Sequence, residues 1–260
     1  MQRAPAASGR GEVHVLNRQA VVARSFARAL TARGLAGVFA GLLSLGVAGA
    51  ALAEEGGGVA SYFPLDVGRV WTFNLRITNA QQTRTIEYST RVARIEDVGG
   101  LPCAVFEDHS GERLLQVNWF ALDPASGAIV QPQRQTGRTV SALCRRSGDE
   151  VGTAGRVLLE ARALEALPQA TSWEWASPDG SSKGTVTLVG REKLRLRNFG
   201  ELDCLVLLDE GTASSGDRTA TIERKVWLAP GLGCVQERTK ISSGGAVTES
   251  EATLVRHDAP

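Results

Sequence analysis

Two short stretches contain the residue types of nucleophilic catalysis. Asp108-His109-Ser110 has the residues of a hydrolase triad, but successive strand residues point to opposite faces, so immediate neighbours cannot form the required hydrogen-bonded line. Gly180-Ser181-Ser182-Lys183-Gly184 matches the letters of a G-x-S-x-G nucleophile elbow, which needs a strand before it and a helix after it. Here the hairpin turn sequence Ser177-Pro178-Asp179-Gly180 precedes it and the strand pattern of residues 185–189 follows. Both stretches are predicted to be turns, and we predict that the protein is not an enzyme.

Metal and cofactor chemistry have no motif in this chain. No CxxC, HExxH or calcium loop is present, and these are the spacings that place several ligands on one ion. We therefore expect no metal and no cofactor. Carboxylates such as Glu96-Asp97 and Asp209-Glu210 could still meet across strands as in glycosidases, so a hydrolase remains the least favoured alternative.

Four cysteines, Cys103, Cys144, Cys204 and Cys234, follow the first hundred residues. An even number in an oxidising compartment favours two disulfides. Our first choice among the three connectivities pairs Cys103 with Cys144 and Cys204 with Cys234. In a simple meander the second pair would lie two strands apart, about 9.5 Å, beyond the roughly 7 Å limit for a bridge, so this pairing requires a curled sheet.

The N-terminal segment has the parts of an export signal. Residues 1–33 contain six arginines and one glutamate, and an apolar run, residues 35–53, ends in Ala51-Leu52-Ala53. This order of a basic stretch, an apolar core and small residues is typical of a secretory signal peptide, and we expect cleavage after Ala53. A retained membrane anchor is the alternative, and the membrane is contacted only if this segment is not cleaved. We expect a periplasmic or secreted protein.

Cleavage leaves 23 positive and 27 negative side chains, because six of 29 basic and one of 28 acidic residues leave with residues 1–53. The formal net charge of the remaining chain is then −4. A nucleic-acid-binding domain is expected to be basic. We therefore expect no nucleic-acid partner.

The rest of the chain predicts an all-β protein. Residues 71–78 alternate between apolar and polar side chains, with Trp71, Phe73, Leu75 and Ile77 on one face. Turn residues recur about every ten positions, which is typical of antiparallel strands. Residues 156–167 are the exception, and they could form a short helix or a strand followed by a linker. The sequence predicts curved antiparallel sheets or a half-barrel.

Two similar repeats are predicted within this β structure. Gly99-x-Leu101-x-Cys103-x-Val105 matches Gly200-x-Leu202-x-Cys204-x-Val206, and Trp119 and Trp227 each precede a Pro and Gly turn. The expected boundaries are a signal peptide (1–53), a flexible lead (54–61), a first repeat (62–147), a connector (148–170) and a second repeat (171–257).

Two sets of side chains could bind a ligand. A basic row, Arg191, Lys193, Arg195 and Arg197, shares one strand face, although a solvated face is the default reading of such a row. The second set is aromatic and could line one interior, although core packing is the simpler reading. The aromatic candidates are Trp71, Phe73, Tyr88, Trp119, Trp173, Trp175 and Trp227.

Both ends of the β region resemble a known group. The opening Tyr62-Phe63-Pro64-Leu65-x-x-Gly68-x-x-Trp71-x-Phe73 and the closing Trp227-x-Ala229-Pro230-Gly231-x-Gly233-x-Val235 resemble exported bacterial β proteins of unknown function, similar in shape to the periplasmic lipoprotein carriers LolA and LolB. The resemblance implies curved antiparallel sheets and no catalytic residues. The second repeat departs from the opening pattern, since Ser172 stands in place of the Gly.

These observations favour an exported, non-enzymatic β protein. The aligned apolar face of residues 71–77 suggests that it binds a lipid or another amphipathic molecule of the cell envelope. A structural or interaction module of the envelope, without a small-molecule site, is the alternative.

Overall fold

The computed structural model describes residues 58–136, 139–142, 144–147, 150–151, 155–177, 179–215 and 218–260. The expected signal segment, residues 1–53, and the first part of the flexible lead lie outside these residues. Within the described residues, no helix has the length and apolar composition needed to cross a membrane.

The described chain is almost entirely β structure. Two short helices, α2 (Val59–Tyr62) and α3 (Ala161–Glu165), accompany 15 strands. The strands are β1 (Val70–Asn79), β2 (Thr83–Val98), β3 (Leu101–Ser110), β4 (Arg113–Leu122), β5 (Ile129–Thr136), β6 (Thr139–Ala142), β7 (Cys144–Ser147), β8 (Glu150–Val151), β9 (Arg156–Leu159), β10 (Thr171–Ala176), β11 (Ser182–Leu196), β12 (Gly200–Ser215), β13 (Arg218–Ala229), β14 (Gly233–Ser243) and β15 (Ala246–Asp258).

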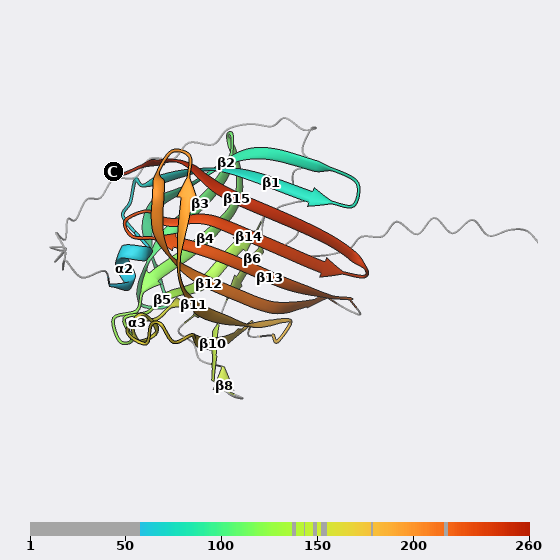
Figure 1. The fold of residues 1–260 in the computed structure, drawn as a ribbon. Coiled ribbons are helices and arrows are strands. Elements are labelled where there is room, and N and C mark those ends of the chain that lie inside the picture. The colour runs from blue at the N-terminus through green and yellow to red at the C-terminus, as the bar shows by residue number, and fades with distance from the viewer. Residues whose placement is uncertain are drawn as a thin grey trace, which may run out of the picture.

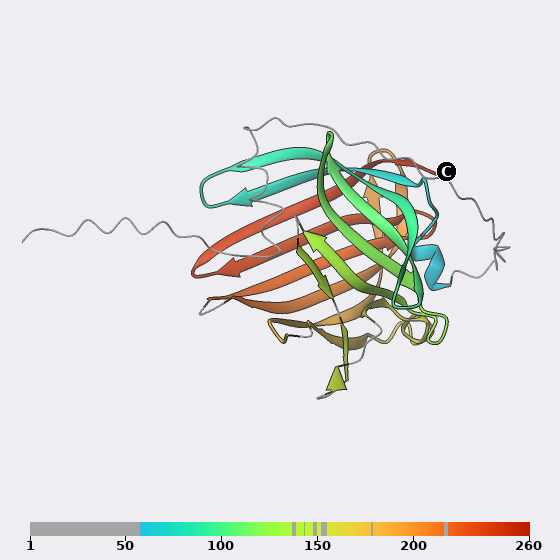
Figure 2. The same ribbon diagram turned by 180° about the vertical axis from the view of Figure 1, so that it is seen from behind.

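These strands form one antiparallel sheet with the order β6-β5-β4-β3-β2-β1-β15-β14-β13-β12-β11-β10-β7-β8. The first and last long strands, β1 and β15, are neighbours, and β9 pairs with β5 outside this path. Figures 1 and 2 show how the sheet curls, with β13 to β15 on one side and β3 to β5 crossing steeply behind them. The predicted all-β fold of curved antiparallel sheet is confirmed, as a nearly closed barrel.

Local sequence explains the hairpins between long strands. Gly99 and Gly100 join β2 to β3, and Gly244 and Gly245 join β14 to β15, with all four φ angles between 56° and 86°. Two consecutive residues with positive φ make the turn whose twist matches the flanking strands, and glycine adopts this conformation without a steric penalty. The turns therefore hold the strands in register.

The two halves share details of strand pairing. A register shift between β2 and β3 falls where β2 pairs with Val105, and a shift between β11 and β12 falls where β11 pairs with Val206. Trp119 pairs with Val105, and Trp227 pairs with Val206. Equivalent tryptophans therefore sit beside equivalent bulges. The domain boundaries themselves stay predictions.

Two segments outside the long strands bear on the sequence predictions. Residues 59–62 form α2, and Val59 is buried, so this part of the expected flexible lead is helical and packed. Residues 156–167 contain both forms that the sequence left open, since β9 is followed by α3.

Side-chain contacts connect β9 with β10 and β12. The indole Nε1 of Trp173 on β10 donates a hydrogen bond to the carbonyl oxygen of Val157 on β9, 2.8 Å away. Arg156, also on β9, forms an ion pair with Asp209 on β12. Because β9 is attached to β5, these contacts join opposite arms of the curled sheet.

Candidate functional site

A cavity of about 320 Å³ lies between the arms of the sheet. One part of its wall is aromatic and aliphatic, and another part is polar and charged. Ligand pockets are typically mostly apolar with a few placed polar groups, at roughly 300–1,000 Å³. This cavity has that composition and lies near the lower end of that range.

The apolar wall is built on β1. Trp71, Phe73, Leu75 and Ile77 all face the cavity, as the alternating pattern predicts, because every second strand residue points to the same face. The Phe73 ring stacks on Tyr88 of β2, with ring centroids 5.1 Å apart. Trp71 stacks on a further aromatic ring, Phe106 of β3, at 5.6 Å. The wall is therefore a packed surface of rings and branched side chains.

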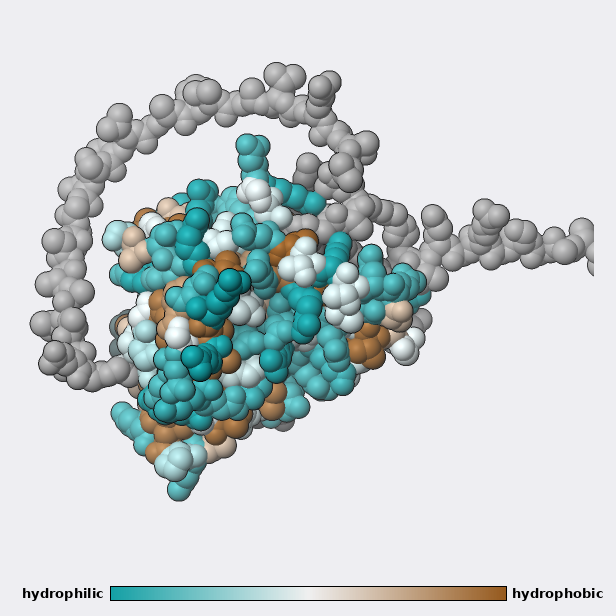
Figure 3. Space-filling view, turned by 45° about the horizontal axis from the view of Figure 1, so that its top comes forward, coloured by the Kyte–Doolittle hydropathy of each residue, from teal (hydrophilic) through white to brown (hydrophobic). Residues whose placement is uncertain are grey.

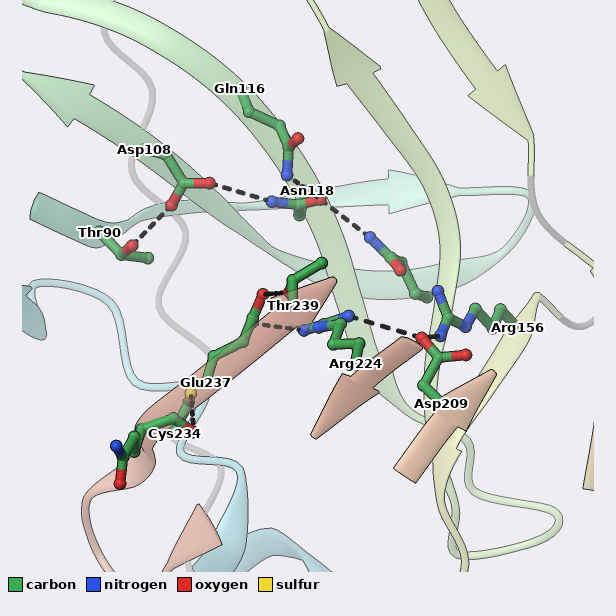
Figure 4. Close-up of polar contacts among 12 residues, drawn as sticks. Thr90, Asp108, Gln116, Asn118, Arg156, Asp209, Arg224, Cys234, Glu237 and Thr239 are labelled. Carbon is green, nitrogen blue, oxygen red and sulfur yellow. Dashed lines mark hydrogen bonds and ion pairs between the residues drawn. The ribbon is translucent and has the colours of Figure 1, made fainter. Parts of the chain in front are cut away.

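A polar row with one carboxyl group follows β2 to β5 (Figure 4). The hydroxyl of Thr90 donates to Asp108 Oδ1 at 2.6 Å, and the amide of Asn118 reaches Asp108 Oδ2 at 3.5 Å. Gln131 and Gln116 both donate to Asn118 Oδ1, at 2.9 and 3.0 Å. The oxygens of Asp108 are thus engaged by neutral donors.

A charged row lies opposite it in Figure 4, on β9, β12, β13 and β14. Asp209 accepts hydrogen bonds from Arg156 and from the Trp175 indole, and Arg224 Nη1 lies 3.9 Å from Asp209 Oδ2. The other end of Arg224 pairs with Glu237 at 2.9 Å. In this row each carboxylate is therefore paired with an arginine.

The surroundings shift the pKa values of this row. Burial opposes ionisation of Asp209, but the charges of Arg156 and Arg224 outweigh it and hold its pKa below the ordinary value. Burial also opposes the charge on Arg224, yet Glu237 and Asp209 raise its pKa. Both groups are charged at neutral pH.

Arg134 on β5 differs from the other two arginines. It lines the cavity, and its side chain has no hydrogen bond or salt bridge to any described residue, with Nε buried and unpartnered. Burial, together with the charges of Arg156 and Arg224, lowers its pKa to about 10. Arg134 thus carries a positive charge at neutral pH with its donors free.

Among the carboxyl groups that line the cavity, Asp108 is the one whose pKa is raised. Burial raises its pKa to about 6, the Thr90 hydrogen bond opposes this, Glu237 raises it further, and Arg134 lowers it. Asp108 therefore changes charge near physiological pH, at a position that faces the cavity.

Of the seven aromatic residues predicted to bind a ligand, Trp71, Phe73 and Tyr88 line the cavity. The remaining four tryptophans are buried outside its lining. Trp173 and Trp175 hold the barrel closure, Trp119 belongs to the core cluster that contains Tyr62, and Trp227 donates to Glu192 at 2.8 Å. The structure thus gathers three of the seven at one place.

The stretches that suggested catalysis lie elsewhere. His109 contacts Glu107 at 3.2 Å, and neither residue lines the cavity. Ser181 and Ser182 lie at a hairpin turn, where they bond to Asp179 and Ser177. Among the described residues, no cluster of three His, Cys, Asp or Glu side chains could hold a metal ion.

The predicted disulfides are wrong, because Cys103, Cys204 and Cys234 are free thiols. Cys204 lies on β12 and Cys234 on β14, with β13 between them, so the sheet separates them by two strand spacings, about 9.5 Å. Cys103 is free, so it forms no bridge to Cys144, whose side chain lies outside the described residues. Burial raises the pKa of Cys103 and Cys204 to about 11 and that of Cys234 to about 12.

The basic row on β11 faces a neighbouring strand of opposite charge. Arg191 pairs with Asp203 at 3.1 Å, and Lys193 pairs with Glu201 at 2.8 Å. Arg195 and Arg197 are exposed.

Hydrophilic side chains, coloured teal, predominate on the face of the molecule in Figure 3, and hydrophobic residues, coloured brown, lie there in small groups.

The charged residues of the cavity were missed because a single carboxylate or arginine in a strand usually faces solvent. A signal was present in the alternation. Asp209 follows Leu205 and Leu207 at two-residue spacing, and Arg224 precedes Val226 in the same way. Both charges therefore continue a face that is otherwise apolar, and this is the pattern that marks a buried polar site.

No family model matches the chain, and no curated protein matches it. Among solved structures, an exported protein, so named, with a YmcC-like fold from Bacteroides fragilis is similar over 75% of this chain and 97% of its own, at 12% identity and a TM-score of 0.42. A protein named as a lipoprotein from Parabacteroides distasonis has 14% identity, a TM-score of 0.34 and coverage of 76% and 98%.

The hypothetical lipoprotein YmcC of Escherichia coli has 14% identity, a TM-score of 0.29 and coverage of 71% of this chain and 86% of its own. Similarities this weak carry no argument about function. The resemblance to LolA and LolB stays a prediction.

Proposed function

We propose that this chain is an exported, non-enzymatic binding protein that holds an apolar or amphipathic molecule in the cavity of its barrel. The single observation that carries the proposal is the cavity itself. A space of about 320 Å³ is kept open between a wall of rings and aliphatic side chains and a wall of polar groups, whereas protein interiors are normally packed with few voids larger than a water molecule.

The apolar wall would supply most of the affinity. Transfer of apolar surface from water is worth about 25 cal/mol per Å², and stacked rings such as Phe73 and Tyr88 offer a large surface that loses little side-chain freedom on binding. The polar wall would fix the orientation of the bound molecule, because donors and acceptors placed around an apolar pocket determine which end of a ligand lies where.

The chemistry of the cavity supports binding rather than catalysis. Catalysis by a nucleophile needs a nucleophile within hydrogen-bond reach of a base. Cys234 is the thiol that lines the cavity, and burial raises its pKa to about 12, so it is protonated at neutral pH. The two histidines among the described residues, His109 and His257, do not line the cavity.

A neutral apolar fluorophore, N-phenylnaphthylamine, tests the proposal. We expect it to bind the native protein and to be displaced by dodecanol. The variant Leu75→Trp adds bulk at a buried position on the cavity wall, and it should lose most of this binding. Leu114→Trp, at a position 45% exposed on β4, is the matched control and should bind as the native protein does.

Native mass spectrometry of the protein purified from its own host gives an independent measurement, because a co-purifying amphiphile would add a discrete mass. The proposal fails if the native protein does not bind the fluorophore, or if Leu75→Trp binds it as well as the native protein.

A further inference from the structure

Not every charged side chain of the cavity wall is paired with another. Asp209 is paired with Arg156 and Arg224, and Glu237 is paired with Arg224. The carboxylate of Asp108 is engaged by two neutral side chains. Arg134 is the arginine of this wall whose side chain has no hydrogen bond to any described residue.

The position of Arg134 is set by the sheet. It pairs with Asn118 on β4, which pairs in turn with Phe106 on β3. Residues directly opposite in neighbouring strands share a face, so all three side chains point to the cavity, which they line. The guanidinium therefore lies beside the polar row and within the same enclosed space as the aromatic wall.

A partly buried guanidinium with unpaired N–H donors is unfavourable unless a hydrogen-bond acceptor or an anion pairs with it. A guanidinium has five N–H donors and no acceptor, and a buried charge without a partner costs several kcal/mol in general. The residue is half-buried, and its Nε is buried without a hydrogen-bond partner, so the charge is only partly solvated. An anion that enters the cavity would supply the partner that this side chain lacks.

Resting on the binding function proposed above, we infer that the bound molecule is a single-chain amphiphile whose anionic head group, a carboxylate or a phosphate, binds Arg134 while its chain lies along Trp71, Phe73, Leu75 and Ile77. The planar fork of a guanidinium matches both head groups with two parallel hydrogen bonds. A cavity of about 320 Å³ favours one chain over the two or three chains of a membrane lipid.

The competing sites for the head group are less suitable. Arg224 is held by carboxylates at both ends, and Arg156 is bonded to Asp209 and packed over the Trp175 ring at 4.4 Å. An anion at either position would have to displace a carboxylate that is fixed to the chain. At Arg134 it displaces no described partner.

Displacement of bound N-phenylnaphthylamine compares four ligands with the same alkyl chain: dodecanoate, dodecyl phosphate, dodecanol and dodecyltrimethylammonium. For the native protein we expect at least one of the two anions to bind about tenfold or more tightly than dodecanol, since a charge-assisted hydrogen bond contributes about 1.5–3 kcal/mol and roughly 1.4 kcal/mol is a factor of ten. The relative affinity of the two anions identifies the head group. The cation should bind most weakly.

Single-residue variants test whether Arg134 causes the preference for anions. Arg134→Gln should remove the preference for the anions over dodecanol, whereas Arg134→Lys, which keeps the charge, should retain part of it. Arg195→Gln, at an exposed position on β11, is the control and should behave as the native protein does.

The outcomes separate the two proposals. If dodecanol binds as tightly as both anions, or if Arg134→Gln keeps the full anion preference, the head-group inference is overturned and the binding function stands. If the native protein does not bind the fluorophore, the binding function is overturned and the head-group inference with it.

Discussion

Arg156 on β9 forms a buried ion pair with Asp209 on β12, 53 residues away, and this contact joins the strand attached to β5 to the opposite arm of the sheet. Asp209 also accepts a hydrogen bond from Trp175 and lies near Arg224. One carboxylate thus connects closure of the barrel with the charged wall of the cavity.

Breaking this pair should strongly destabilise the protein. Arg156→Ala leaves Asp209 buried with a weaker set of partners, and loss of one member of a buried pair costs about 3–5 kcal/mol. The effect is measured by urea denaturation. The double variant Arg156→Met with Asp209→Leu should recover much of the loss, because it removes both charges. As a control, Lys193→Ala breaks the exposed pair with Glu201 and should cost about 0–1 kcal/mol. A loss of stability of similar size from Arg156→Ala and from Lys193→Ala would contradict this account.

Replacement of Arg134, whose side chain has no described hydrogen-bond partner, should stabilise the protein. Arg134→Met replaces a half-buried charge by an apolar side chain of similar length, and we expect the ligand-free protein to gain about 1 kcal/mol, the low end of the gain from replacement of fully buried charges. Differential scanning calorimetry reads this as a higher Tm. Arg195→Met on the exposed face should leave the Tm nearly unchanged. A lower Tm for Arg134→Met would show that the charge has a structural partner.

Asp108 should make stability fall as pH rises between about 4 and about 6. Its pKa rises from 3.8 to about 6 in the folded protein, so the folded state binds more protons than the unfolded state within this window, and stability decreases with rising pH there. The groups that act on it are Thr90, Glu237, Arg134 and His109. Urea denaturation across this window, compared with Asp108→Asn, isolates its contribution. The difference between the two proteins should grow up to about pH 6 and then level off, and a constant difference would contradict the assignment.

Anion binding should follow the same titration. An ionised Asp108 adds a negative charge to the cavity wall, so affinity for dodecyl sulfate, whose own charge does not change over this range, should fall as pH rises through about 6. Binding of neutral dodecanol should not change over this range. Asp108→Asn should remove this part of the pH dependence, and calorimetric titration at several pH values measures it.

Gly184 should not tolerate a side chain. A Cβ atom there would lie 2.3 Å from the carbonyl oxygen of Glu210 and 3.0 Å from the Trp175 indole nitrogen. Gly184→Ala must therefore shift the backbone or displace Trp175, and overpacking of this kind costs about 1–3 kcal/mol. Lys183→Ala, at the exposed neighbouring position, is the control. Urea denaturation and tryptophan fluorescence measure the effect, and an unchanged spectrum with unchanged stability would contradict it.

The export signal gives a chemical prediction. N-terminal sequencing of the protein recovered from the periplasm or the medium should begin at Glu54, because the small residues Ala51 and Ala53 precede that bond. A sequence that begins at Met1 in a membrane fraction would favour the retained anchor.

The alternating pattern of residues 71–77 determined much of this protein. A strand has a side-chain period of two, so apolar residues at every second position fix which face is buried, and Gly99-Gly100 fixes a turn by conformational preference alone. These rules are local, and they correctly gave the all-β class and the apolar wall on β1. The matching Cys103 and Cys204 motifs likewise indicated two halves with similar strand pairing.

Which strands meet across the barrel depends on the closure of the sheet, which no local pattern specifies. Arg134, Asp209 and Glu237 come from β5, β12 and β14, and nothing in their immediate neighbours states that they share one cavity. The disulfide prediction was wrong because the sheet does not curl enough to bring Cys204 and Cys234 together, and β13 keeps β12 and β14 two strand spacings apart. Alternation assigns a residue to a face, but closure of the sheet brings faces together over long sequence separations, and the charges of the cavity acquire their partners and their pKa values only there.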